Sequence, residues 1–102
     1  MPYAQNQGIK VYYESYGQGK PLVLVIGLGG TTDAWKYQID FFSKYYQVIV
    51  FDNRGAGKTD KPDEPYNMKL FASDLKAILD DLKLDKVSLL GLSMGGLIIQ
   101  EF

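Results

Sequence analysis

The chain has 102 residues, of which 46% are hydrophobic and 14% aromatic, and it contains neither cysteine nor histidine. This length fits one domain at most, and the composition excludes collagen-like, disordered and coiled-coil classes. Eleven basic and twelve acidic residues give a net charge of −1, and the lysines do not form the basic clusters of a nucleic-acid-binding protein. The lack of cysteine excludes disulfides and thiolate metal sites, and the lack of histidine excludes a serine–histidine–acid triad within this chain alone.

The sequence shows no membrane or export signal. The most apolar run, residues 22–30, is rich in glycine and far shorter than the roughly 20 residues that cross a bilayer as a helix. The N-terminus lacks the basic region and apolar core of a signal peptide. We therefore expect a cytoplasmic location and no membrane partner.

The first half of the chain predicts a hairpin, a buried strand and a helix, separated by turns. Apolar and polar residues alternate over residues 9–15, which predicts a strand with one wetter face. Asn6-Gln7-Gly8 before it is typical of a hairpin turn, with residues 3–5 as the short partner strand. Residues 22–26 are continuously apolar and predict a strand buried on both faces. After Gly27-Leu28-Gly29-Gly30, a helix is expected from about Ala34, with Trp35 on its apolar face.

The second half continues the alternation of strands and helices. Residues 48–51 predict a buried strand, followed by a long loop. Asn67 is a candidate N-cap for an amphipathic helix, since apolar residues recur at helical spacing from Phe71 to Leu82. Residues 87–90 predict a strand apolar on both faces, as in the centre of a sheet, and residues 97–102 the first turns of a helix. This order predicts one α/β domain over residues 1–102: three α/β/α layers with a mostly parallel sheet and an N-terminal antiparallel hairpin.

The segment Gly91-Leu92-Ser93-Met94-Gly95 matches the pattern G-x-S-x-G. In a nucleophile elbow, this pattern lies between a strand and a helix, because the serine must sit on a tight turn. The predicted elements on either side provide that context, so Ser93 is the candidate nucleophile. The alternative is a glycine-rich strand–helix turn whose serine has no catalytic role.

The glycine-rich turn at residues 27–30 can direct backbone N–H groups at a developing oxyanion. The candidate donors are the N–H groups of Leu28 and of Met94, the residue after the nucleophile. Dinucleotide binding is the rival interpretation, but it requires a third glycine where the sequence has Thr32. We therefore favour the oxyanion hole.

The end of the loop Gly55-Ala56-Gly57-Lys58-Thr59 resembles a phosphate-binding loop. The full pattern requires glycine at position 52, where the sequence has Asp52, and no helix is expected directly after the loop. We favour a structural, hydrogen-bonded loop end for Asp52 and Arg54. By the same reasoning Trp35 is expected in the core, and the charged residues Lys76, Asp80 and Lys83 on a solvated helix face.

Together, three segments of the sequence resemble the N-terminal part of the α/β-hydrolase fold superfamily, in particular its esterase, enol-lactonase and cofactor-free haloperoxidase-like members. They are the elbow at residues 91–95, the turn at residues 26–30, and residues 52–60, which are similar to the family pattern D-x-R-G-x-G-x-S. The resemblance implies Ser93 as nucleophile and the Leu28 and Met94 N–H groups as oxyanion hole. It differs at Ile26, where the family often has a histidine.

In this superfamily the triad acid and histidine follow far downstream of the elbow, whereas this sequence ends nine residues after Ser93. We therefore expect a partial α/β-hydrolase fold, truncated after the elbow. The complete enzyme would cleave small-molecule carboxylic esters or lactones without a cofactor or metal, and the chain alone would be inactive. The alternative is a non-catalytic, hydrolase-like module that associates with itself through an exposed sheet edge.

Overall fold

The computed structural model describes residues 3–26, 31–61, 67–84 and 86–91. Strands and helices alternate after an N-terminal hairpin, as the sequence predicts. The elements in chain order are β1 (Tyr3–Asn6), β2 (Ile9–Tyr16), β3 (Lys20–Val25), the 3₁₀ helix η1 (Thr32–Trp35), α1 (Lys36–Phe42), β4 (Tyr46–Phe51), α2 (Met68–Asp81) and β5 (Ser88–Gly91). The expected helix at Ala34 therefore begins as a 3₁₀ turn, and no side chain caps its N-terminus. The helix expected over residues 97–102 lies outside the described residues.

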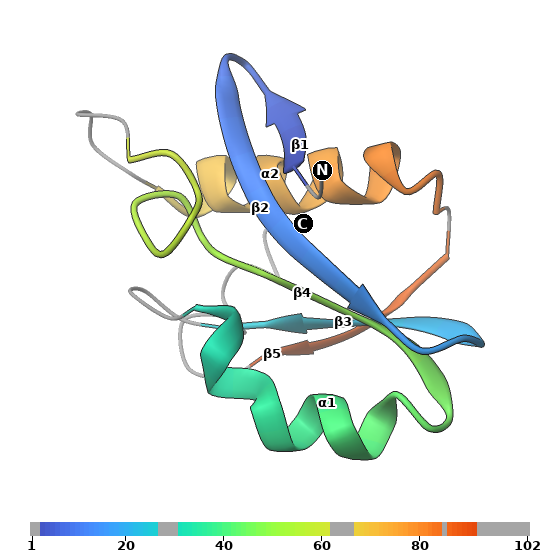
Figure 1. Cartoon of the computed structure of the whole chain (residues 1–102). Coiled ribbons are helices and arrows are strands. Elements are labelled where there is room, and N and C mark those ends of the chain that lie inside the picture. Colours follow the sequence, from blue (N-terminus) through green and yellow to red (C-terminus); the bar gives the residue numbers. More distant parts are fainter. Residues whose placement is uncertain (1–2, 27–30, 62–66, 85, 92–102) are drawn as a thin grey trace.

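The strands form one mixed sheet in the order β1-β2-β4-β3-β5 (Figure 1). Strand β3 is parallel to both β4 and β5, whereas β1, β2 and β4 pair antiparallel. In the described part of the chain, β5 pairs with β3 on one side only, and Leu90 is 41% exposed. Among the described residues this strand, whose composition is typical of the centre of a sheet, therefore lies at the sheet edge.

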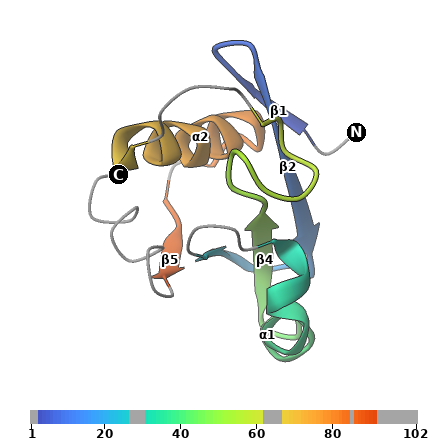
Figure 2. The same cartoon turned by 90° about the vertical axis from the view of Figure 1, so that its left-hand side faces the viewer.

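The two helices cover opposite faces of the sheet (Figures 1 and 2). Successive residues of a strand point to opposite faces, so β3 and β4 contribute to both layers. Toward α1, one core cluster contains Leu22, Leu24, Trp35, Val48 and Val50. Toward α2, the larger cluster contains, among others, Val23, Val25, Ile49, Phe51, Phe71, Leu75 and Ile78. The burial on both faces predicted for these two strands and the core position expected for Trp35 are thus confirmed.

The first hairpin closes through a two-residue turn. Asn6 pairs with Ile9, and Gln7 and Gly8 both have positive φ, at 52° and 84°. Two consecutive left-handed residues match the right-handed twist of the flanking strands, and glycine adopts this conformation without a steric cost. The hairpin predicted at this position is confirmed, with β1 extending one residue further than expected.

Helix α2 begins and ends with capping motifs. The Asn67 side chain accepts a hydrogen bond from the Leu70 N–H at 2.9 Å, which confirms Asn67 as the N-cap. At the other end Lys83 has a φ of 58°, and the Leu84 N–H donates to the Leu79 carbonyl across the turn. This is a Schellman arrangement with lysine in the place usually taken by glycine.

The helices described here are too short or too polar to cross a bilayer.

Tyr13 joins β2 to the last residue of α2. Its hydroxyl donates to the Asp81 carboxylate at 2.6 Å, and burial together with this carboxylate raises the pKa of Tyr13 to about 12. Because the folded state holds the phenol proton more tightly than the unfolded state, this contribution to stability is complete below pH 10. It is lost as the pH rises from about 10 to 12.

We therefore expect the free energy of unfolding of the Tyr13→Phe variant to fall less steeply between pH 10 and 12 than that of the native chain. The difference should be about 1.4 kcal/mol for each unit by which the Tyr13 pKa is raised. Urea titrations followed by circular dichroism at pH 9 and 11.5 measure it. Tyr37→Phe, which removes a phenol that is 80% exposed, is the control. Equal declines in both variants would contradict the assignment to Tyr13.

Candidate active site

The candidate site lies at the C-terminal ends of the parallel strands. In the register of β3 and β5, Val25 is opposite Gly91, and both strands run in the same direction (Figure 1). The segment containing Leu28 and the segment containing Ser93 therefore start from neighbouring points of one sheet edge. Such an edge is where open α/β sheets bind their ligands. The residues predicted for catalysis, Leu28, Ser93 and Met94, themselves lie outside the described residues, and their roles stay predictions.

The loop that follows β4 at the same edge is folded around Asp52. The Asp52 carboxylate, only 2% exposed, accepts hydrogen bonds from the Thr32 N–H at 2.7 Å and the Lys58 N–H at 2.8 Å. Gly57 has a positive φ of 52°, and a Cβ atom there would collide with this carboxylate. The Thr59 hydroxyl donates to the Asp52 carbonyl at 2.6 Å. The hydrogen-bonded loop end predicted for Asp52 is confirmed.

These contacts also explain why the loop is not built for a phosphate. A phosphate-binding loop presents free backbone N–H groups to its ligand. Here the Lys58 N–H is taken by the loop's own carboxylate, Asp52. The Lys58 ammonium lies over the Tyr12 ring, 4.8 Å from its centroid, where it makes a cation–π contact. The geometry of the described loop residues thus agrees with the preference for a structural role.

Asn53 connects the β4 loop to the end of β3. Its side-chain amide donates to the Ile26 carbonyl at 2.8 Å, and the residue is fully buried. Ile26 directly precedes the glycine-rich turn at residues 27–30. This contact was not predicted from the sequence, because no local pattern relates residues 26 and 53.

Arg54 forms a buried ion pair with Asp74 of α2. The Arg54 Nε and Nη2 atoms donate to the two carboxylate oxygens at 2.7 and 2.8 Å, and the side chains are 2% and 0% exposed. The Asn6 amide adds a third hydrogen bond to Asp74 at 2.8 Å. The yellow-green loop after β4 therefore lies between β2 and α2, as Figure 2 shows. This partner was not predicted: an aspartate on the apolar face of the helix indicates a buried polar contact, but it does not identify Arg54 as the other residue.

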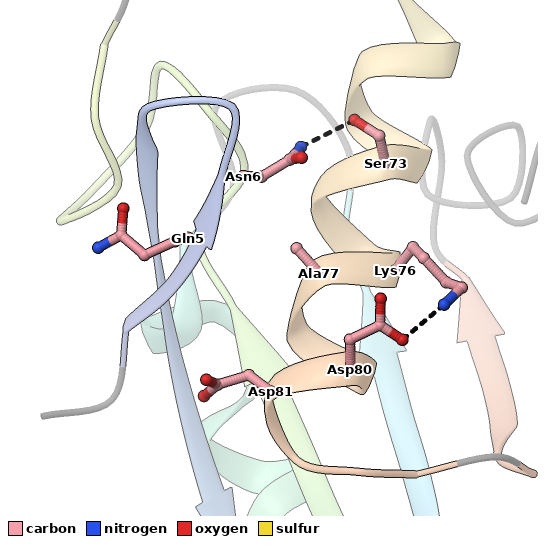
Figure 3. Close-up of a pocket in the computed structure, with 7 residues that line it drawn as sticks. All are labelled: Gln5, Asn6, Ser73, Lys76, Ala77, Asp80 and Asp81. Atoms are coloured by element: carbon pink, nitrogen blue, oxygen red, sulfur yellow. Dashed lines mark hydrogen bonds and ion pairs between the residues drawn. The ribbon is translucent and has the colours of Figure 1, made fainter.

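The cleft in Figure 3 lies between β1 and α2 and has a volume of about 470 Å³. It is lined by Gln5, Asn6, Ser73, Lys76, Ala77, Asp80 and Asp81. Asn6 donates to Ser73, and Lys76 pairs with Asp80 one helical turn away. Lys76 and Asp80 are more than half exposed, which confirms the solvated helix face expected for them. None of the lining residues belongs to the ends of β3 or β5, so this cleft is separate from the candidate site.

The acidic side chains do not gather into a metal centre in the described part of the chain. Within these residues, no group of three or more potential ligands lies close enough together to hold an ion. Of the buried carboxylates in the β4 loop and α2, Asp52 accepts from backbone N–H groups and Asp74 is paired with Arg54.

The model of the alpha/beta hydrolase fold family matches residues 20–102. The chain belongs to this family. It is 33% identical over 101 residues to the putative carbamate hydrolase RutD of Azorhizobium caulinodans, with 99% of this chain and 38% of the relative covered. The family assignment inferred from the three segments of the sequence is thereby confirmed.

Two solved structures of the alpha/beta hydrolase fold resemble the chain closely. Est816, described as an N-acyl homoserine lactone degrading enzyme, superposes with a TM-score of 0.94 at 39% identity, over 98% of this chain and 39% of that one. The enol-lactonase from Burkholderia xenovorans gives 0.89 at 34% identity, over 95% and 39%. The chain thus spans about two fifths of the length of these proteins, and the partial α/β-hydrolase fold is confirmed.

Proposed function

We propose that this chain is the N-terminal part of a serine hydrolase that cleaves carboxylic esters or lactones through an acyl-enzyme on Ser93. The observation that carries the proposal is the pairing of Val25 with Gly91. Because of this pairing, the segment with Leu28 and the segment with Ser93 begin next to each other, at the C-terminal ends of β3 and β5. Similarity to an enol-lactonase and to a lactone-degrading enzyme supports a small-molecule ester or lactone as substrate.

In this mechanism the Ser93 hydroxyl attacks the carbonyl carbon of the substrate while a general base takes its proton. The resulting oxyanion accepts hydrogen bonds from the Leu28 and Met94 N–H groups. The intermediate collapses to an acyl-enzyme while the base gives its proton to the alkoxide oxygen of the broken C–O bond. The alcohol of an ester then leaves, whereas the new hydroxyl of an opened lactone stays on the acyl chain, and water cleaves the acyl-enzyme in the same manner. The chain contains no histidine, so a histidine base comes from a part of the enzyme outside these residues. The family resemblance implies the same for the acid that orients it. The reaction requires neither cofactor nor metal, and we expect it in the cytoplasm.

Labelling with a fluorophosphonate tests this proposal, because the oxygen of an activated serine displaces fluoride from the reagent and forms a stable phosphonate ester. We expect one adduct, mapped to Ser93 by peptide mass spectrometry, in the protein encoded by the complete reading frame that contains this chain. Residues 1–102 alone should neither react nor hydrolyse a p-nitrophenyl ester, since an unassisted serine is a weak nucleophile. Labelling of another serine, or turnover by residues 1–102, would contradict the proposal.

The open side of β5 favours a second candidate function, a non-catalytic module that associates with another copy of itself. In the described residues β5 pairs only with β3, and Leu90 is 41% exposed at this edge. An unpaired strand edge can add a strand from another chain. A stable dimer of residues 1–102 in size-exclusion chromatography, from a reading frame that stops after Phe102, supports the module. A frame that continues with an acidic residue and a histidine supports the enzyme.

A further inference from the structure

Two consecutive residues at the end of β4 hold both sides of the glycine-rich turn. On one side the Asn53 amide donates to the carbonyl of Ile26, the residue before Gly27, at 2.8 Å. On the other side the Asp52 carboxylate accepts from the N–H of Thr32, two residues after Gly30, at 2.7 Å. Since Asp52 and Asn53 are joined by one peptide bond, the two contacts fix the positions of the turn's flanks relative to each other.

The two holding residues are themselves fixed to the sheet. Asp52 is 2% exposed and Asn53 is fully buried. The Asp52 N–H donates to the Tyr12 carbonyl of β2 at 3.0 Å, and its second carboxylate oxygen accepts from Lys58. Hydrogen bonds to a buried carboxylate are stronger than those between neutral groups. A side chain with this many partners cannot move without breaking several of them, so it is a rigid support.

We propose that Asp52 and Asn53 are positioning residues for the turn at residues 27–30. They act through Ile26 and Thr32 and touch no reacting atom. The Asn53 amide holds this end of the turn through the main-chain carbonyl of Ile26. The contact does not depend on the Ile26 side chain, which has no polar atom. The catalytic meaning rests on the proposed function, in which Leu28 supplies an oxyanion donor. Such a donor must lie about 3 Å from the oxyanion, and a misplacement of about 1 Å can cost 10²-fold in rate.

Amide hydrogen exchange of the 102-residue chain tests the positioning directly. Asn53→Asp keeps the size of the side chain and removes its N–H donor. We expect exchange at residues 27–32 to accelerate about 10- to 100-fold relative to the β4 amides, as the loss of a buried hydrogen bond predicts. Asn67→Asp is the matched control, because Asn67 acts through its oxygen, which aspartate retains. The control should leave residues 27–32 within about twofold of the native rates.

Asp52→Asn provides a second variant if Asn53→Asp fails to fold. It keeps one of the two acceptor oxygens and loses the charge, so exchange should accelerate at Thr32 and Lys58, whose N–H groups donate to the Asp52 carboxylate. In the complete enzyme, Asn53→Asp should lower kcat about 10- to 100-fold with KM within about threefold, since the turn acts in the transition state. Exchange at residues 27–32 that rises no more than in β4, or equally in Asn67→Asp, would overturn the inference. Accelerated exchange in a complete protein that no fluorophosphonate labels would overturn the proposed function alone.

Discussion

Replacing Ser93 by alanine in the complete hydrolase is expected to lower kcat by about 10⁶-fold. The substitution removes the atom that forms the acyl-enzyme, so the remaining rate is that of direct attack by water. Oxyanion donors and substrate binding alone still accelerate such an attack by about 10³- to 10⁴-fold over solution. Steady-state hydrolysis of p-nitrophenyl esters and of simple lactones, measured with the native and substituted proteins, gives the ratio.

Ser88 offers a matched control for this substitution. It is an exposed serine of β5, five residues before Ser93, and its partner in the sheet is Leu22 rather than a residue at the candidate site. We expect Ser88→Ala to retain kcat and KM within about twofold, because surface substitutions away from special contacts have small effects. A Ser93→Ala protein with more than a tenth of the native activity would show that the hydrolysis does not pass through an acyl-enzyme on this residue.

The fold was predictable where neighbouring residues determine the structure. The spacing from Phe71 to Leu82 predicts α2, and the side chain of Asn67 determines its first turn. Gln7 and Gly8 determine the hairpin in the same local way. The order of the strands was not predictable, because β2 pairs with β4 and β3 with β5 across long separations in the sequence. No periodicity within one segment encodes such a pairing.

The candidate site was likewise predictable only where a local pattern determines it. The pattern of residues 91–95 marks Ser93 as a candidate, since the elbow is a local turn with its own residue requirements. The buried polar contacts could not be located from the sequence, because each joins residues far apart. Asp52 and Arg54 were assigned to a hydrogen-bonded loop end, but their partners Thr32 and Asp74 are each 20 residues away. Buried polar groups require partners, and only the three-dimensional arrangement identifies them.

The second large effect is expected for Arg54→Ala, which should lower the free energy of unfolding by about 3–5 kcal/mol. The Asp74 carboxylate, which is 0% exposed in the native chain, then keeps the Asn6 amide as a hydrogen-bond donor among the described residues but has lost its counterion. A buried charge without its counterion is strongly destabilising. A domain of this size is stable by about 5–15 kcal/mol, so the loss is a large part of the total. Urea unfolding followed by circular dichroism measures it.

Lys76→Ala is the control for the effect of losing an ion pair as such. Lys76 and Asp80 also form a pair on α2, but their side chains are 60% and 63% exposed. Because water screens this pair, its loss should cost less than about 0.5 kcal/mol. A similar cost for Lys76→Ala and Arg54→Ala would show that the Arg54–Asp74 pair is not buried in solution.

The double variant Arg54→Met/Asp74→Leu separates the two causes of the loss. If the cost of Arg54→Ala arises from an uncompensated buried carboxylate, removal of both charges should restore much of the stability. Asn6 loses one acceptor in the double variant but keeps the Ser73 hydroxyl, to which its amide also donates at 2.9 Å. We therefore expect the double variant to be more stable than Arg54→Ala. If it is as unstable as the single variant, the ion pair itself, rather than the penalty for an isolated charge, holds the β4 loop against α2.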